Sequence, residues 1–169
     1  MTIEALKKRI KVTENLRAIV GTMKALSSVS ILQYEQANTA LAQYRRNLKD
    51  AFHALIKQGG LPKNEVKTAQ NRQLVILIGT DNGMVGKFNK EILDKAKADL
   101  KKQGVPLKDT LFLTVGKRIG GLAMQSNLKL YAKYAVANSV KMVNTIAETV
   151  IMKIDEATRK EHITSVCVW

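Results

Sequence analysis

Apolar side chains recur three and four residues apart through residues 3–56, a stretch that contains no proline and only one glycine, Gly21. This spacing places the apolar side chains along one side of an α-helix. At about 1.5 Å per residue, such a helix would be about 80 Å long. The rest of a 169-residue chain is too small to bury it. We therefore expect the first third of the chain to need a partner.

The apolar stripe does not keep one register. Six residues separate Ile10 from Leu16, and eight separate Leu26 from Tyr34, so we expect the stripe to change direction at both places. Small residues lie between these breaks and allow either close approach of another backbone or a weak, bending segment. After the second break the spacing is heptad-like at Tyr34, Ala37, Leu41, Tyr44, Leu48, Ala51 and Leu55.

Basic residues crowd the start of the predicted helix. Thr2 is placed to cap it, and Lys7, Lys8, Arg9 and Lys11 follow within the next turns. Four positive charges near a helix N-terminus oppose the helix dipole. Two interpretations stay open, a solvated basic face and a contact with acidic groups on a partner.

Two glycines and a proline, Gly59, Gly60 and Pro62, predict the end of this helix. We expect three parts: the helix over residues 1–58, a polar linker over residues 59–73, and a lobe over residues 74–169. In the lobe, short β-rich runs at 74–78, 111–115, 128–136 and 163–169 alternate with helical patterns at 87–103, 117–125 and 140–159. This alternation predicts a mainly parallel, doubly wound α/β sheet. Because the sequence stops within the last predicted strand, at Trp169, we expect a fragment or a shortened relative.

Composition narrows the class of protein. No apolar run approaches the length of a membrane span, and the N-terminus lacks the apolar core of a signal peptide. The single cysteine, Cys167, cannot form an internal disulfide, so a reducing cytoplasm is expected and secretion is not. The net charge of +14 favours an anionic partner: nucleic acid, anionic lipid or an acidic protein surface.

The most distinctive local motif follows the first predicted strand, over residues 78–89. Its glycines match neither a dinucleotide fingerprint nor a P-loop, and Asp81 would repel a phosphate. We therefore expect no cofactor, and interpret Gly83 and Gly86 as residues of a tight turn that Asp81 caps. A small nucleotide-binding α/β enzyme with a helical arm stays as an alternative.

Catalytic and metal-binding patterns are weak. The two histidines, His53 and His162, fall on different predicted elements, and neither is expected beside Cys167. His53 is expected near the apolar stripe of the first helix, as a surface or packing residue. No metal-ligand spacing is present, so no catalytic or metal site is predicted. A basic nucleic-acid-binding protein is a further alternative, but only 5% of residues are aromatic, which leaves few side chains for base stacking.

Two motifs resemble those of the gamma subunit of F-type ATP synthases. The first is Ala5-Leu6-Lys7-Lys8-Arg9-Ile10-Lys11 followed by residues 19–26. The second is residues 80–89, Thr-Asp-Asn-Gly-Met-Val-Gly-Lys-Phe-Asn. Residues 22–26 and 33–37 are similar to the alternate, N-type branch of that family. The chain departs from the family in having no second long helix after the lobe, and in Ser30 and Lys87.

The resemblance implies a rotor subunit without catalytic function, whose lobe is Rossmann-like. It would couple ion translocation mechanically to ATP synthesis or hydrolysis, at the cytoplasmic face of the membrane as a peripheral subunit. Implied partners are the alpha and beta subunits, the epsilon subunit and the membrane rotor ring, with no specific nucleic acid. The implied stator-contact residues are Lys7, Lys8, Arg9, Lys11, Met23 and Lys24. The implied seam of an antiparallel coiled coil is Tyr34, Leu41, Tyr44, Leu48 and Leu55, and the isolated chain would self-associate through it.

Overall fold

A computed structural model of the chain describes residues 2–60 and 72–169. Residues 61–71 of the expected linker therefore lie outside the described part. The chain divides into two compact units. One contains the long first helix, and the other contains the sheet and the remaining helices.

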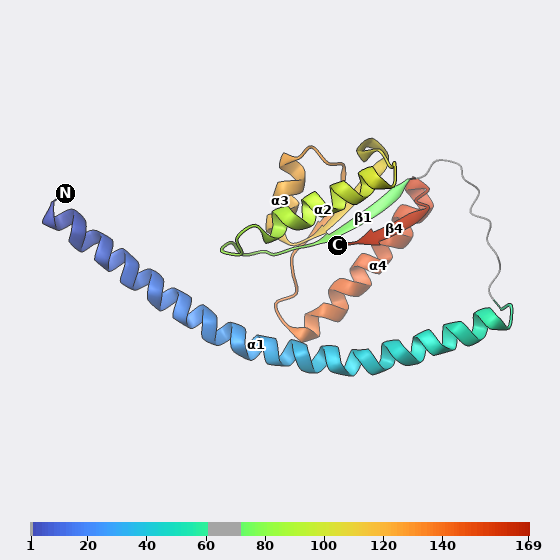
Figure 1. The fold of residues 1–169 in the computed structure, drawn as a ribbon, viewed down its shortest axis with the longest axis horizontal. Coiled ribbons are helices and arrows are strands. Elements are labelled where there is room, and N and C mark those ends of the chain that lie inside the picture. The colour runs from blue at the N-terminus through green and yellow to red at the C-terminus, as the bar shows by residue number, and fades with distance from the viewer. Residues whose placement is uncertain (1, 61–71) are drawn as a thin grey trace. The chain divides into compact units, whose positions relative to one another are not determined.

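The first unit is one uninterrupted helix, α1 (Ile3–Lys57), which bends smoothly in Figure 1. Thr2 caps it as predicted, because its Oγ1 accepts a hydrogen bond of 3.4 Å from the backbone N–H of Ala5. The helix ends where Gly59 takes a positive φ of 70°, a conformation that glycine adopts readily. No residue of α1 is buried.

The segment with small residues remains helical. The hydroxyl groups of Thr22, Ser28 and Ser30 donate hydrogen bonds of 3.0–3.1 Å to the backbone carbonyls four residues earlier. Such bonds satisfy the hydroxyl groups locally and often bend a helix slightly. A Cβ at Gly21 would meet no atom within 4 Å, so this glycine is not required by any contact in the structure.

Because α1 is one unbroken helix, the position of each apolar side chain around its axis follows from the residue number. At about 100° per residue, the apolar positions from Leu16 to Leu55 fall within a sector of about 100°. Ile3, Leu6 and Ile10 lie roughly on the opposite side. The apolar stripe therefore changes direction strongly between Ile10 and Leu16. It does not change direction between Leu26 and Tyr34 as expected, because eight residues turn a regular helix by only about 80° beyond two full turns, which keeps Tyr34 within the same sector.

The second unit is a four-stranded sheet with helices between its strands. Its elements are β1 (Gln73–Ile78), α2 (Phe88–Lys102), the 3₁₀ turn η1 (Leu107–Asp109), β2 (Thr110–Val115), α3 (Lys117–Gln125), β3 (Leu130–Tyr134), α4 (Val140–Glu161) and β4 (Ser165–Val168). The strand order is β3-β2-β1-β4, and every pairing is parallel. The α/β prediction is confirmed, although β3 and β4 are shorter than predicted.

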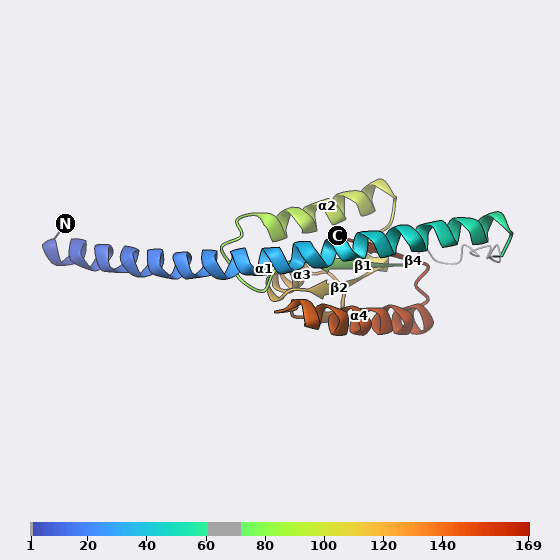
Figure 2. The ribbon, with the colours of Figure 1, turned by 90° about the horizontal axis from the view of Figure 1, so that it is seen from below.

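Side chains alternate between the two faces of the sheet and form two cores. Val75, Leu77 and Phe112 pack on one face against α2 and α3. Leu74 and Leu113 pack on the other face against α4. Figure 2 shows α2 and α4 on opposite sides of the strands. Because all strands are parallel, α2, α3 and α4 begin at the same edge of the sheet, where the strands end.

Candidate interaction surfaces

The basic residues at the start of α1 spread over about 200° of its circumference. Taking Lys7 as reference, Lys11 lies about 40° away around the axis, Lys8 about 100° and Arg9 about 200°. All four are exposed, and no ion pair of Lys7, Lys8 or Lys11 with another described residue occurs within 4 Å. This arrangement is a collar of positive charge, which presents cations to groups on several sides of the helix.

Met23 and Lys24 lie between three and four turns beyond Lys11 along α1. Met23 falls within the apolar sector and is 37% exposed, the lowest value among the large apolar side chains of α1. Lys24 points about 100° away from it, and its backbone carbonyl accepts the hydrogen bond from Ser28. The collar and Met23 are thus exposed to solvent.

The apolar seam of α1 is uncovered in this structure. Its members are 39–60% exposed: Tyr34, Leu41, Tyr44, Leu48 and Leu55. The opposite side carries Thr39, Arg46 and Asp50. His53 also lies well away from the seam, not beside the stripe as expected from the sequence. The second half of α1 is therefore amphipathic, with an apolar face of the kind that packs against another helix.

In the lobe, Asp81 links three loops. Its Oδ1 accepts a hydrogen bond of 2.8 Å from the backbone N–H of Lys117, and both oxygens lie 3.2 Å from the backbone nitrogen of Val136. The loops after β1, β2 and β3 are thereby joined. Asp81 was expected to cap its own turn. That turn is closed instead by Thr80, whose Oγ1 donates to the carbonyl of Asn82 at 2.9 Å.

Asn89 holds the same turn from α2. Its Oδ1 accepts from the backbone N–H of Thr80 at 3.0 Å, and its Nδ2 donates to Thr80 Oγ1 at 2.9 Å. Asn89 is buried, so these bonds satisfy an amide that could not otherwise reach water. In the sequence this residue stands only as the end of a motif, and no role was expected of it.

The glycines of the turn differ in what they require. Gly86 has a φ of 58°, which favours glycine, whereas Gly83 has no positive φ, and a Cβ added there would lie 3.3 Å from the guanidinium of Arg118. Two other glycines are more constrained: Gly79, the first glycine of the same motif, and Gly116, for which no role was predicted. A Cβ at Gly79 would collide with Asn89 Oδ1, and one at Gly116 would lie 2.9 Å from the backbone of Thr80.

Phosphate binding at the start of α3 is not favoured by this geometry. In nucleotide folds an anion occupies a helix N-terminus at this edge of the sheet. Here the carboxylate of Asp81 already accepts from the first backbone N–H of α3, that of Lys117. The protein's own carboxylate therefore takes an anion position.

The remaining reactive side chains are dispersed. His53 lies on α1, His162 caps α4 with a φ of 55°, and Cys167 is half-buried in β4. Within residues 2–60 and 72–169, no group of three or more His, Cys, Asp or Glu side chains is arranged to hold a metal ion.

Charged side chains on α4 pair with one another. Glu156 accepts hydrogen bonds from Lys153 and Lys160, and these bonds lower the pKa of Glu156 to about 2. The same contacts raise the pKa of both lysines. This network lies on the outer surface of the lobe and does not touch the β1–α2 turn.

The described part of the chain is a parallel α/β lobe and a long helix with an exposed apolar seam. Comparison with known families shows the family to which the chain belongs. The family described as ATP synthase matches residues 2–168, and the chain belongs to that family. The resemblance to a gamma subunit is confirmed.

Curated relatives are named ATP synthase gamma chain. One from Geotalea uraniireducens is 27% identical over 137 residues, covering 79% of this chain and 47% of the relative. One from Limosilactobacillus reuteri is 23% identical over 163 residues, covering 89% of this chain and 52% of the relative. The chain thus spans about half the length of the curated relatives it matches.

The helices also bear on membrane insertion. No helix in the described part of the chain combines the length and the apolar character needed to cross a membrane.

Proposed function

We propose that the chain serves as a rotor element of an ATP synthase and couples ion translocation mechanically to ATP synthesis or hydrolysis. The observation that carries this proposal is α1, a helix of 55 residues with no buried residue. A helix of about 80 Å that its own lobe does not bury is suited to transmit torque between two distant partners. Membership of the ATP synthase family supports this interpretation.

The first half of α1 would turn within the alpha and beta subunits. A collar of cations attracts acidic groups at long range without fixing one orientation. Met23 would sit at the bearing, where its flexible, polarizable side chain adapts to several surfaces. The neighbours of a rotating shaft change at every step, so both properties suit the role.

The second half of α1 would pair with another helix through the seam from Tyr34 to Leu55. The lobe would bind the epsilon subunit and the membrane rotor ring, which places the complex peripherally at the cytoplasmic face of the membrane. On this proposal the chain is non-catalytic and binds no cofactor, and ATP chemistry belongs to its partners.

Substitution of Met23 tests the coupling role. In a reconstituted complex, Met23→Lys should lower the number of ions pumped per ATP hydrolysed, because it places a charge in an apolar bearing. Thr39→Lys is the matched control, since it adds the same charge on the polar side of α1 and should leave the ratio unchanged. An unchanged ratio in Met23→Lys would count against the bearing.

A further inference from the structure

Strand β4 forms one edge of the lobe's sheet and pairs with β1. The backbone N–H and C=O of Trp169 bond to Ile76 and Ile78, at 2.9 Å and 2.8 Å. Backbone groups alternate in direction along a strand, so those of Val166 and Val168 point away from β1. Apart from the pairing of β4 with β1, no backbone hydrogen bond to these two valines occurs among the described residues. The edge thus presents two donors and two acceptors to another strand.

The side chains of this edge are uncharged, from Ser165 to Trp169. Val166 is 39% exposed and Val168 is 61% exposed. Val168 also lines an apolar groove of about 400 Å³ between α4 and the sheet. At the opposite edge, β3 carries the exposed Lys133. Charged residues on an edge strand hinder pairing with another chain, and β4 lacks this protection.

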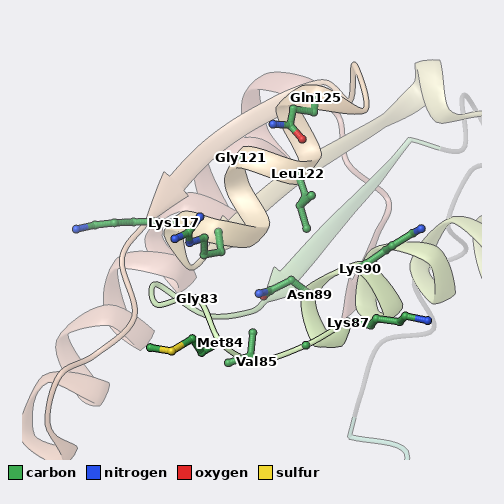
Figure 3. Close-up of a pocket in the computed structure, with 12 residues that line it drawn as sticks. Gly83, Met84, Val85, Lys87, Asn89, Lys90, Lys117, Gly121, Leu122 and Gln125 are labelled. Atoms are coloured by element: carbon green, nitrogen blue, oxygen red, sulfur yellow. The ribbon is translucent and has the colours of Figure 1, made fainter. Parts of the chain in front are cut away.

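The net charge of +14 limits where two copies of the chain can meet. A cavity of about 650 Å³ between the β1–α2 loop and α3 is lined by several cations, and no acidic residue is among the described residues that line it. Figure 3 shows Lys117 extending to one side of this cavity and Lys87 and Lys90 to the other. Two copies that met through this cavity would bring like charges together, whereas contact through β4 brings none together.

The β4 strand is complementary to a second copy of itself. A two-fold axis pairs the same strand of two copies in antiparallel directions. When the axis passes through Cys167, Val166 of each copy lies opposite Val168 of the other. All the outward-facing N–H and C=O groups of these valines are then bonded. The cross-strand neighbours are apolar in both pairs, and the two sheets become one continuous sheet.

We propose that β4 is an interface between two copies of this chain, paired antiparallel about Cys167. A strand of this length makes a small interface, so the dimer is weak and forms at roughly 100 µM chain or above. The interface needs neither the apolar seam of α1 nor the rotor role proposed above. A failure of the coupling test would leave it standing, and the reverse also holds.

The oligomeric state is measured on the full chain carrying Leu41→Gln and Leu48→Gln, which remove association through the seam. Sedimentation equilibrium at increasing concentration should show a monomer–dimer equilibrium. The dimer should strengthen as salt is added, because salt screens the repulsion between two copies of charge +14. A dimer held by ion pairs would weaken instead, and that result would contradict the proposal.

Cys167 reports the register of the pairing. It would lie opposite Cys167 of the other copy at a position without cross-strand hydrogen bonds, where the two Cα atoms are about 4.5 Å apart. Disulfides form at that separation. Diamide takes up the two electrons and two protons that the thiols release, and should link two copies covalently. Cys167 is the single cysteine of the chain, so no other disulfide can form.

Two variants in the same background locate the interface. Val168→Lys should weaken the dimer about tenfold or more and slow the cross-link, because it places a charge in both valine pairs. Val166→Pro should act in the same direction, because it removes an N–H that points away from β1. Met152→Lys is the matched control: it adds the same charge at a position of α4 that is 72% exposed, and should dimerise as its parent does.

Three results would overturn the proposal. The first is a chain that stays monomeric at every concentration, which would leave the β4 edge to a strand of a different protein. The second is a Val168→Lys chain that dimerises as strongly as its parent. The third is a dimer that diamide does not link through Cys167, which would assign the contact to another surface.

Discussion

Single residues at the carboxyl edge of the sheet hold the lobe together. Asp81 joins the loops after β1, β2 and β3 through bonds to the backbone of Lys117 and Val136. Hydrogen bonds to a charged acceptor contribute more than those between neutral groups. A residue that the sequence suggests as a local turn cap is thus a long-range connector.

Asp81→Ala should destabilise the lobe by about 1.5–3 kcal/mol, because it leaves these backbone N–H groups without their acceptor. Urea unfolding followed by the fluorescence of Trp169 measures this, since Trp169 is the only tryptophan and packs against the core on the α2 and α3 side. Asp94→Ala is the control, because Asp94 is exposed and forms no ion pair with a described residue. Equal stability of Asp81→Ala and wild type would refute the connector role.

Gly116→Ala should cost at least about 2 kcal/mol, because Gly116 has a φ of 128° and its Cβ would press on the backbone of Thr80. Gly83→Ala should cost about 0.5 kcal/mol or less, because only the flexible end of Arg118 has to move. Denaturant midpoints of the two variants compare them directly. A larger loss in Gly83→Ala would contradict the geometry.

The glycines show what a sequence pattern can and cannot predict. The turn after β1 was predictable from the dense glycines between a strand and a helix, and Gly86 has the left-handed conformation that such turns use. The need for Gly116 was not predictable in the same way, because it arises from Thr80, which is 36 residues away in the chain. Close approach between distant segments leaves no local pattern.

At the scale of elements, periodicity predicted most of the lobe. The continuous apolar run of β1 indicated a strand buried on both faces, and the 3.6-residue spacing in 87–103 predicted α2 nearly to its ends. The ends of β3 and β4 were predicted less accurately, because both predicted runs are longer than the observed strands. Flanking residues still bond to the neighbouring strands, as Trp169 does to Ile76 and Lys129 does to Phe112, so the predicted runs overshoot only the regular part of each strand.

The seam of α1 predicts self-association of the isolated chain, since it exposes an apolar stripe on one side of the helix. Leu41→Gln with Leu48→Gln should shift the chain toward monomer in sedimentation velocity. Thr39→Gln with Arg46→Gln has the same spacing on the opposite side and should leave the association unchanged. A wild-type chain that stays monomeric at high concentration would contradict this use of the seam.

The network on α4 predicts a small pH dependence. The folded pKa of Glu156 lies near 2, below its ordinary 4.5, so its contribution is fully present above pH 4.5 and is lost as the pH falls toward 2. The stability difference between wild type and Glu156→Gln, from urea midpoints at a series of pH values, should therefore close over that range. The difference itself is small because the groups are exposed to solvent. A gap that stays constant with pH would rule out this network.

At the scale of the whole molecule, the chain divides into two compact units. The sequence alone predicted a helix too long for its own lobe and a lobe without a catalytic or cofactor pattern. It could not predict the cavity beside α3, because that cavity depends on how the loop after β1 lies against another helix. On the proposed function, the exposed surfaces of α1 serve as contacts with other proteins.

The most direct test of the rotor role is purification of the tagged chain from its native cells, followed by quantification of the proteins that accompany it. We predict that ATP synthase alpha and beta subunits are recovered in fixed proportion to the chain. Recovery of the chain without them, under conditions that keep the rest of the ATP synthase assembled, would contradict that role.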